Sequence, residues 1–201
     1  MISLIIGLGN IGSKYTPTRH NLGFELLNRL ATRFGVASRE YFDNYHEAAV
    51  DSDGRTIRLL WPTTYVNKSG LAAADSLATN GLSPADIIVV YDDFELPLGR
   101  LRIRTTGSAG GHRGMASIID HLGTDEILRL RMGIGPIPPG LDPVAFVLGK
   151  FAEEEIKIKN KVLEKSVEAV LYLLVHPPER AMDIYNRDPA PDEQHPGPFD
   201  N

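Results

Sequence analysis

The sequence predicts a single-domain α/β protein in which a mixed, mostly parallel and twisted sheet is flanked by helices, giving three layers. Segments typical of strands and of helices alternate along the chain, as they do in α/β domains. Two strand segments, Ile2–Ile6 and Asp86–Tyr91, are mainly apolar, as expected of strands covered on both faces in a parallel sheet. The 201 residues, 42% of them hydrophobic, can form one buried core, and no repeat or linker interrupts residues 1–187.

In the N-terminal half, apolar spacing and the residues at segment ends define the elements. The leucines of the first helix recur at helical spacing, and Gly35 follows them, as glycine often follows a helix C-terminus. Ile57, Leu59 and Trp61 recur at every second position after the turn Ser52-Asp53-Gly54, which predicts a hairpin. The elements expected here are the strand Ile2–Ile6, the helix Asn21–Phe34, the hairpin strands Glu47–Asp51 and Arg55–Trp61, and the helix Val66–Thr79.

Glycine and proline mark the ends of elements in the C-terminal half. The glycine-rich segment Gly107–Gly114 connects a half-exposed strand to a short helix. Pro177-Pro178 ends a long helix, because proline disrupts the helical hydrogen-bond ladder. The elements expected here are the strands Asp86–Tyr91, Leu101–Arg104 and Leu128–Ile134, and the helices Met115–Leu122, Glu153–His176 and Glu179–Asn186.

The composition excludes several classes of protein. Without cysteine the chain has no disulfide scaffold, thiolate metal site, thiol nucleophile or iron–sulfur cluster. A net charge of −5 excludes a globally basic nucleic-acid binder. No apolar run approaches the roughly 18 residues that a membrane span needs. Met1 leads directly into the first strand without the basic segment of a signal peptide, so we expect a cytoplasmic protein.

Charge is distributed unevenly along the chain. Residues 188–201 contain four acidic residues, four prolines and no lysine or arginine, which predicts a disordered acidic tail. Between Arg100 and Arg131, six arginines outnumber three acidic residues. This basic strip consists of Arg100, Arg102, Arg104, Arg113, Arg129 and Arg131. It could bind an anion, although charge alone favours solvated strand edges.

The segment from Gly7 to Gly12 matches the dinucleotide fingerprint G-x-G-x-x-G and follows a strand. The fingerprint also requires a helix that opens at the glycines and an acidic residue about 20 positions later. Here the chain continues as a loop to Pro17, and that acidic residue is missing. We therefore favour a tight turn that directs Asn10 into a crevice.

One histidine and one aspartate lie where α/β enzymes carry their active sites. His20 precedes the first helix, and Asp92 follows the strand Asp86–Tyr91. Ligands of open α/β sheets bind outside the carboxyl ends of strands, so both side chains could face one crevice. A carboxylate that accepts from one imidazole nitrogen leaves the other nitrogen as a base. Alternatively, two residues so far apart in sequence are unrelated.

Absent motifs narrow the chemistry. The chain lacks G-x-S-x-G, H-E-x-x-H and P-loop motifs, and its other histidines lack metal-ligand spacing, so a hydrolase would use a base-activated water. Asn67 could donate its amide to a substrate carbonyl, or simply begin a helix. The segment Gly107–Gly114 suits an oxyanion or phosphate because backbone N–H groups converge there, or it is a flexible connection.

Taken together, these residues resemble the bacterial-type peptidyl-tRNA hydrolase family. The resemblance covers residues 1 to about 187 and rests on blocks that follow one another in the family's order. The blocks are Gly7-Leu8-Gly9-Asn10-Ile11-Gly12, Tyr15 with Thr18-Arg19-His20-Asn21, Pro62 to Gly70, Asp92 with Leu96-Pro97-Leu98-Gly99, Gly110-Gly111-His112-Arg113-Gly114, Arg129 to Gly135, and Phe146-Val147-Leu148-Gly149-Lys150.

The resemblance implies an enzyme that hydrolyses the ester between peptide and tRNA, without metal or cofactor, and so recycles tRNA from stalled translation. The sequence shows no long coiled coil or apolar interface stripe, and we expect a monomer. The resemblance also implies that His20 activates water and that Asp92 orients His20. The substrate-binding residues that it implies are Asn10, Tyr15, Val66, Asn67, His112 and Arg113. Arg104 and Arg131 stand where the family holds the 5′ phosphate of tRNA.

The chain departs from the family pattern at several positions. Ile11 replaces the usual proline, Val66 replaces the usual methionine, and the loop 136–143 lacks the basic residues common in other members. Arg113 replaces the asparagine of the G-G-H-N-G block. We hypothesise that Arg113 contacts phosphate or sugar of the tRNA acceptor end, because a helix N-terminus already favours anions.

Three functions are therefore compared. The first is peptidyl-tRNA hydrolysis, and the second is a catalytically silent RNA-binding relative, which the change at Arg113 suggests. The third, a dinucleotide oxidoreductase, is disfavoured by the context of the glycine motif. Retention of His20, Asp92, Asn10 and Asn67 favours the enzyme.

Overall fold

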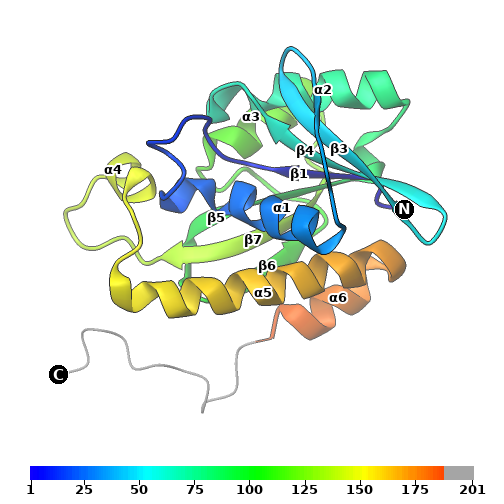
Figure 1. The fold of residues 1–201 in the computed structure, drawn as a ribbon. Helices are drawn as coiled ribbons and strands as arrows, with labels where there is room; N and C mark the ends of the chain where they lie inside the picture. Colours follow the sequence, from blue (N-terminus) through cyan, green and yellow to red (C-terminus); the bar gives the residue numbers. More distant parts are fainter. Residues whose placement is uncertain (188–201) are drawn as a thin grey trace.

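A seven-stranded sheet forms the centre of the computed structural model, which describes residues 1–187, and helices cover both faces (Figure 1). This arrangement confirms the predicted three-layer α/β architecture. The tail 188–201, predicted to be disordered, lies outside the described residues. In spatial order the strands are β2 (Glu40–Tyr41), β3 (Tyr45–Ser52), β4 (Arg55–Pro62), β1 (Leu4–Gly7), β5 (Ile87–Pro97), β7 (Leu128–Gly135) and β6 (Leu101–Arg104).

The sheet is mixed, as predicted, and its parallel strands occupy the centre. Parallel pairs join β4 to β1, β1 to β5, and β5 to β7. On the two outer sides of this group, β3 pairs antiparallel with β4, and β6 pairs antiparallel with β7. Because Gly7 pairs with Val90, β1 ends beside β5. The carboxyl ends of these two strands form the edge at which an α/β sheet usually binds its ligand.

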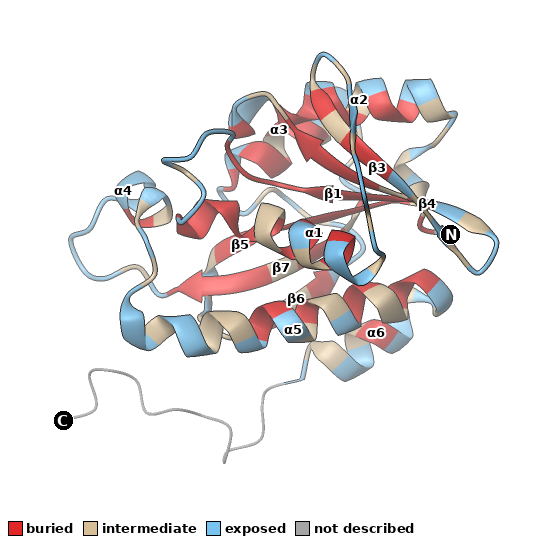
Figure 2. Ribbon diagram, viewed as in Figure 1, coloured by how far each residue is buried: buried red, intermediate tan, exposed pale blue. Residues whose placement is uncertain are grey.

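The helices form two layers with separate apolar cores (Figures 1 and 2). One layer contains α1, α5 and α6, and the other contains α2 and α3. The helices are α1 (Leu22–Arg33), α2 (Ser69–Asn80), α3 (Arg113–Leu122), α4 (Pro143–Leu148), α5 (Glu153–Val175) and α6 (Pro178–Tyr185), with short 3-10 turns η1 (Arg19–Asn21), η2 (Val66–Lys68) and η3 (Pro84–Asp86). Within residues 1–187, no helix combines the length and apolar character required to cross a membrane.

Helix α1 lies directly against the backbone of the two central strands. A Cβ atom at position 23 would lie 2.5 Å from the carbonyl oxygens of both Leu8 and Val90. Gly23 therefore allows a closer approach than any larger residue would permit. The close packing of α1 also positions η1, the turn directly before α1, which contacts β5.

Two strands differ from the sequence prediction. β5 does not end at Asp92-Asp93 but continues to Pro97, because its ladder with β7 resumes, after a register shift beyond Asp93, at the pair of Pro97 with Gly135. β2, of two residues, pairs with β3 and was not predicted. Such a short exposed strand has no apolar alternation by which it could be found.

Two helices also differ from the prediction. α3 begins at Arg113 rather than Met115, because the side chain of His112 accepts a hydrogen bond from the Met115 N–H and caps the helix. α4 was not predicted at all. Its start is fixed by Asp142, whose carboxylate accepts from the N–H of Ala145 at 2.8 Å. Six residues are too few to show helical periodicity.

Candidate active site

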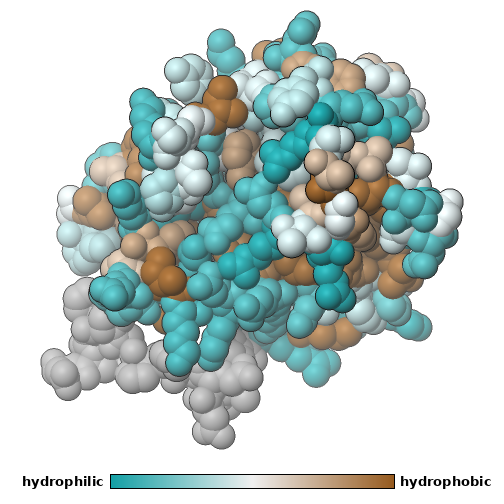
Figure 3. Space-filling model, viewed as in Figure 1, coloured by the Kyte–Doolittle hydropathy of each residue, from teal (hydrophilic) through white to brown (hydrophobic). Residues whose placement is uncertain are grey.

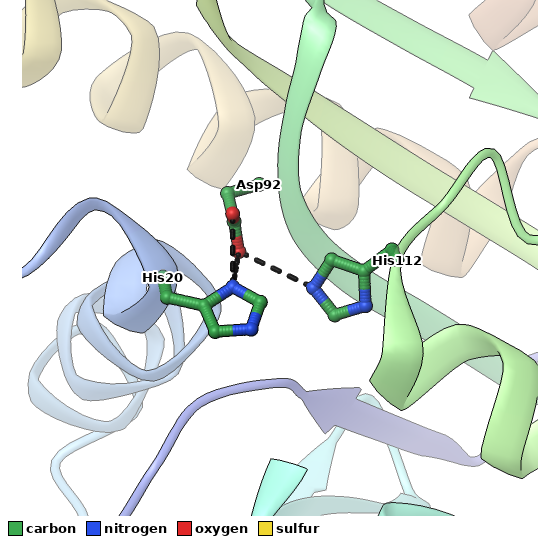
Figure 4. Close-up of side chains that lie close together, drawn as sticks. All are labelled: His20, Asp92 and His112. Atoms are coloured by element: carbon green, nitrogen blue, oxygen red, sulfur yellow. Dashed lines mark hydrogen bonds and ion pairs between the residues drawn. The ribbon is translucent and has the colours of Figure 1, made fainter. Parts of the chain in front are cut away.

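His20 and Asp92 meet where the turn before α1 approaches β5 (Figure 4). The His20 Nδ1 atom lies 3.0 Å from each carboxylate oxygen of Asp92. The side chains are buried, with relative exposures of 8% for His20 and 1% for Asp92. The structure thus brings together the two residues that their strand-end positions had linked.

A second histidine contacts the same carboxylate. The Nε2 atom of His112 lies 3.3 Å from Asp92 Oδ1, and the rings of His112 and His20 have centroids 4.8 Å apart. His112 was expected only among the substrate-binding residues. Its contact with Asp92 depends on the conformation of the preceding loop, which no sequence signal specifies.

The hydrogen-bond partners of His20 and His112 show which ring nitrogen carries the proton when each imidazole is neutral. His112 Nδ1 accepts from the Met115 N–H at 3.2 Å, so its Nε2 carries the proton and donates to Asp92. The ionised carboxylate can only accept, and His20 therefore donates from Nδ1. The remaining nitrogen, His20 Nε2, holds a free electron pair, which is what a general base requires.

The same contacts shift the pKa values of both residues. Burial lowers the pKa of His20, but the charge and hydrogen bond of Asp92 more than offset it, so the pKa lies above its usual value. Arg113 opposes this rise through its positive charge. Burial alone would raise the pKa of Asp92, yet the two histidines hold it well below its usual value. Asp92 is therefore ionised at neutral pH.

A cavity of about 420 Å³ opens over this cluster. Part of its lining is polar and includes His20, Asp92, His112 and the exposed Asn67. Another part is apolar and is supplied by Phe94 and by α4. The α4 residues that line it are Pro143, Val144, Val147 and Leu148. This apolar wall was missed because α4 itself was not predicted.

The cluster also brings together three side chains of kinds that can bind a metal ion. One potential ligand atom from each of His20, Asp92 and His112 lies within 4.8 Å of the others, so these side chains could in principle hold a metal ion. Spacing in sequence could not reveal this, since the three residues come from η1, β5 and the loop before α3. In the structure their nitrogen and oxygen atoms are engaged with one another.

Comparison with known proteins gives the cluster its context. Residues 4–193 match the model of the family described as peptidyl-tRNA hydrolase. A peptidyl-tRNA hydrolase of Thermotoga petrophila is 49% identical over 183 residues, which cover 91% of this chain and 96% of the relative. The chain belongs to the peptidyl-tRNA hydrolase family. A peptidyl-tRNA hydrolase of Synechocystis sp. is 44% identical to this chain over 191 residues, which cover 94% of this chain and 98% of the relative.

Solved structures of the family share the fold. The crystal structure of peptidyl-tRNA hydrolase from Acinetobacter baumannii superimposes with a TM-score of 0.84 at 33% sequence identity. The match covers 92% of this chain and 94% of that one. The resemblance inferred from the sequence blocks is therefore confirmed at the level of family and fold.

The glycine turn after β1 holds Asn10 as expected. The Asn10 side-chain oxygen accepts from the Val66 N–H at 3.0 Å, and within residues 1–187 its amide N–H groups have no hydrogen-bond partner. Asn21 fixes the backbone of Asn10 from both sides, donating to its carbonyl at 2.9 Å and accepting from its N–H at 2.8 Å. Asn21 is thus a supporting residue that the sequence reasoning did not single out.

Other expected binding residues lie outside the cavity lining. Tyr15 is half-buried beside Lys14, whose Nζ lies 4.7 Å from its ring centroid, and it does not line the cavity. Arg131 is engaged by a hydrogen-bonded ion pair between its Nε and the carboxylate of buried Asp93. Arg104 is exposed on β6, the edge strand of the sheet.

Arg113 lines the cavity as the first residue of α3. It is exposed, and within residues 1–187 it forms no hydrogen bond or ion pair. Its charge nevertheless acts on His20, whose pKa it lowers. The residue that departs from the family pattern therefore contributes an uncompensated cation to the rim of the site.

Proposed function

We propose that this protein hydrolyses the ester bond between peptide and tRNA in peptidyl-tRNA and so returns tRNA from stalled translation. The family membership supports the substrate. The observation that carries the chemistry is the free electron pair on His20 Nε2, next to a cavity, with Nδ1 bound to buried Asp92.

In the proposed reaction, His20 Nε2 takes a proton from a water molecule as that water attacks the ester carbonyl. Asp92 stabilises the imidazolium that forms, because an adjacent carboxylate favours the charged ring. The tetrahedral intermediate then breaks its bond to the terminal ribose oxygen. His20 returns the proton to that oxygen, so a free peptide carboxylic acid and tRNA leave with the water atoms accounted for.

The asparagines and the apolar wall are proposed to hold the peptide end. The free amide N–H groups of Asn10 and the exposed amide of Asn67 can donate to the ester carbonyl, whose oxygen becomes negative in the transition state. Val66, which is buried and lines the cavity, and His112 would limit the space around the ester. Tyr15 does not line the cavity, and we propose that it contacts a part of the substrate that extends beyond the cavity.

The arginines are proposed to hold the tRNA end. Arg104 and Arg131 would bind the 5′ phosphate, with Arg131 pre-oriented by Asp93. Arg113 would contact phosphate or sugar of the acceptor end, where the N-terminus of α3 adds to the attraction for anions.

The decisive experiment is peptide release from N-acetylaminoacyl-tRNA by the purified protein and by His20→Ala. We expect wild-type turnover and a loss of about 10²–10⁴-fold in the variant, the usual contribution of a positioned base. tRNA affinity and the thermal unfolding midpoint should stay nearly unchanged. If the wild-type protein binds the substrate without releasing peptide, it is instead a silent RNA-binding relative.

We further propose that the enzyme works as a cytoplasmic monomer, since its substrate is produced by ribosomes in the cytoplasm. Hydrophilic side chains dominate the surface along α1 and α5 (Figure 3), which supports the monomer. Light scattering after gel filtration tests this state, and a mass near twice 22.1 kDa would contradict it.

A further inference from the structure

The basic strip expected from the sequence includes Arg129, but the structure buries this side chain, with 1% relative exposure. Within residues 1–187 its guanidinium has no carboxylate partner. Instead it donates four hydrogen bonds to backbone carbonyl oxygens. These run from Nε to Ile127 (3.1 Å), from Nη1 to Gly107 (2.8 Å) and Ser108 (2.9 Å), and from Nη2 to Asp125 (2.8 Å).

The four acceptors belong to the two loops that flank α3. Gly107 and Ser108 precede the helix, and Asp125 and Ile127 follow it. A buried charge is tolerated only when its hydrogen-bonding groups are satisfied. The planar guanidinium presents donors in several fixed directions, whereas the ammonium group of lysine is compact and has three. Arginine can therefore satisfy all four carbonyl oxygens from this position, whereas lysine has only three donors.

The loop held by Arg129 leads directly to the active-site cluster. Ala109 follows Ser108, and its carbonyl accepts from the His112 N–H at 3.0 Å. Between them, Gly110 and Gly111 have φ values of 55° and 77°, a conformation that costs glycine little and leaves the segment easy to deform. Arg129 thus holds the start of the segment whose end carries His112 to Asp92.

We propose that Arg129 is a positioning residue for the reaction. By fixing the start of the loop it keeps His112 hydrogen-bonded to Asp92 and keeps Arg113 at the rim of the cavity. The proposal rests on the proposed function for its kinetic consequences, but not for its structural ones. Under this proposal Arg129 does not bind tRNA, unlike the exposed arginines of the basic strip.

The test compares Arg129→Lys with Arg58→Lys as a matched control. Arg58 also lies on a strand and binds a buried carboxylate, Glu47, at 2.7 Å, but it does not line the cavity. We expect kcat to fall roughly 10- to 100-fold in Arg129→Lys, the order of loss that a small misplacement causes. KM and tRNA affinity should change little, and Arg58→Lys should retain wild-type kcat.

The pH profile separates positioning from a general loss of stability. The charged groups that shift the pKa of His20 are Asp92 and Arg113, and His112 hydrogen-bonds to the same Asp92 carboxylate. If His112 leaves Asp92, the carboxylate interacts more strongly with His20, and displacement of Arg113 removes an opposing charge. Both changes raise the pKa of His20, so the acid limb of kcat/KM should move to higher pH in Arg129→Lys only.

A double-mutant cycle shows whether Arg129 acts through His112. In a His112→Ala background, Arg129→Lys should cause little further loss, because residues in one chain of contacts are not additive. Fully additive losses, or a wild-type pH profile in folded Arg129→Lys, would overturn the proposal. If Arg129→Lys does not fold, Arg129→Gln, whose amide can still donate two hydrogen bonds, takes its place in each measurement.

Hydrogen exchange gives a readout that does not depend on catalysis. The amides of residues 107–112 should exchange faster in Arg129→Lys, while those of β5 keep wild-type protection. This result is expected even if the wild-type protein cleaves no peptidyl-tRNA, in which case only the proposed function fails. Unchanged exchange in this loop would remove the basis of the positioning role.

Discussion

At the scale of single residues, the site depends on one carboxylate shared by two histidines. Asp92 accepts from His20 and His112, and the second contact is held by the same imidazole that caps α3. From the sequence, placement suggested that His20 and Asp92 could face one crevice, and the family resemblance then paired them. Placement could not add His112, because the loop between β6 and α3 turns through glycines whose conformation the sequence leaves open.

Replacing Asp92 should test the pair directly. In Asp92→Asn the group that raises the pKa of His20 is removed, so burial dominates and that pKa falls. The neutral base then persists to lower pH, and the acid limb of kcat/KM should move downward. The rate should fall less than in His20→Ala. A profile unchanged in height and position would show that the pair has no role in catalysis.

Replacing Arg113 should move the acid limb of kcat/KM to higher pH, opposite to the shift expected for Asp92→Asn. Arg113→Asn removes a charge that lowers the pKa of His20, so the acid limb should move to higher pH. Affinity for a non-hydrolysable tRNA analogue should also weaken, with a shallower dependence on salt. Arg113→Lys is the control, because it keeps the charge and should keep the limb. An unchanged salt dependence would leave Arg113 without a part in tRNA binding.

At the scale of elements, strong apolar patterns were predicted well and capped or short elements were not. Apart from the C-terminal end of β5, the ends of β1, β4 and β7 and of α1, α2, α5 and α6 were predicted to within a few residues. α3 was placed two residues late because histidine is not among the usual N-cap residues. β5 was ended early because Asp92-Asp93 reads as a strand end, although the ladder with β7 continues.

Helix α4 offers a prediction at this scale. Asp142→Ala removes its N-cap, a change worth about 0.5–2 kcal/mol to a helix. Because α4 supplies the apolar wall of the cavity, KM should rise by up to about fivefold, while kcat and the global unfolding midpoint stay close to wild type. Ser83→Ala, which removes a 2.6 Å hydrogen bond to Asp86 in η3, is the control and should leave KM unchanged.

At the scale of the whole molecule, a near-neutral body carries its positive charge locally. Arg102 and Arg104 lie on β6, the sheet edge, and Arg131 lies on the adjacent strand. Burial lowers the pKa of Arg102, and the positive charges of Arg104, Arg100 and Arg131 lower it further, so these side chains share one positive region. The sequence predicted this strip, but it could not show that Arg129 lies beneath the surface.

The tRNA end of the proposed interaction can be tested through this region. Arg104→Ala should weaken binding of tRNA that has its 5′ phosphate and reduce the slope of log affinity against log salt by about 0.7–0.9. It is cleaner than Arg131→Ala, which also leaves the carboxylate of buried Asp93 without its partner and should lower stability. Equal losses for tRNA with and without the phosphate would indicate only general electrostatic attraction.

The close packing at Gly23 has a consequence for how variants of this enzyme are interpreted. Helix α1, which follows η1, packs this close to the sheet only because position 23 has no Cβ atom, which would overlap the backbone of Leu8 and Val90. A larger residue would push α1 outward and carry His20 away from its carboxylate. In a survey of variants, substitutions at position 23 would therefore inactivate the protein as substitutions of the polar site residues do. Glycine has no reactive side chain, and its contribution is to set the distance between α1 and the sheet.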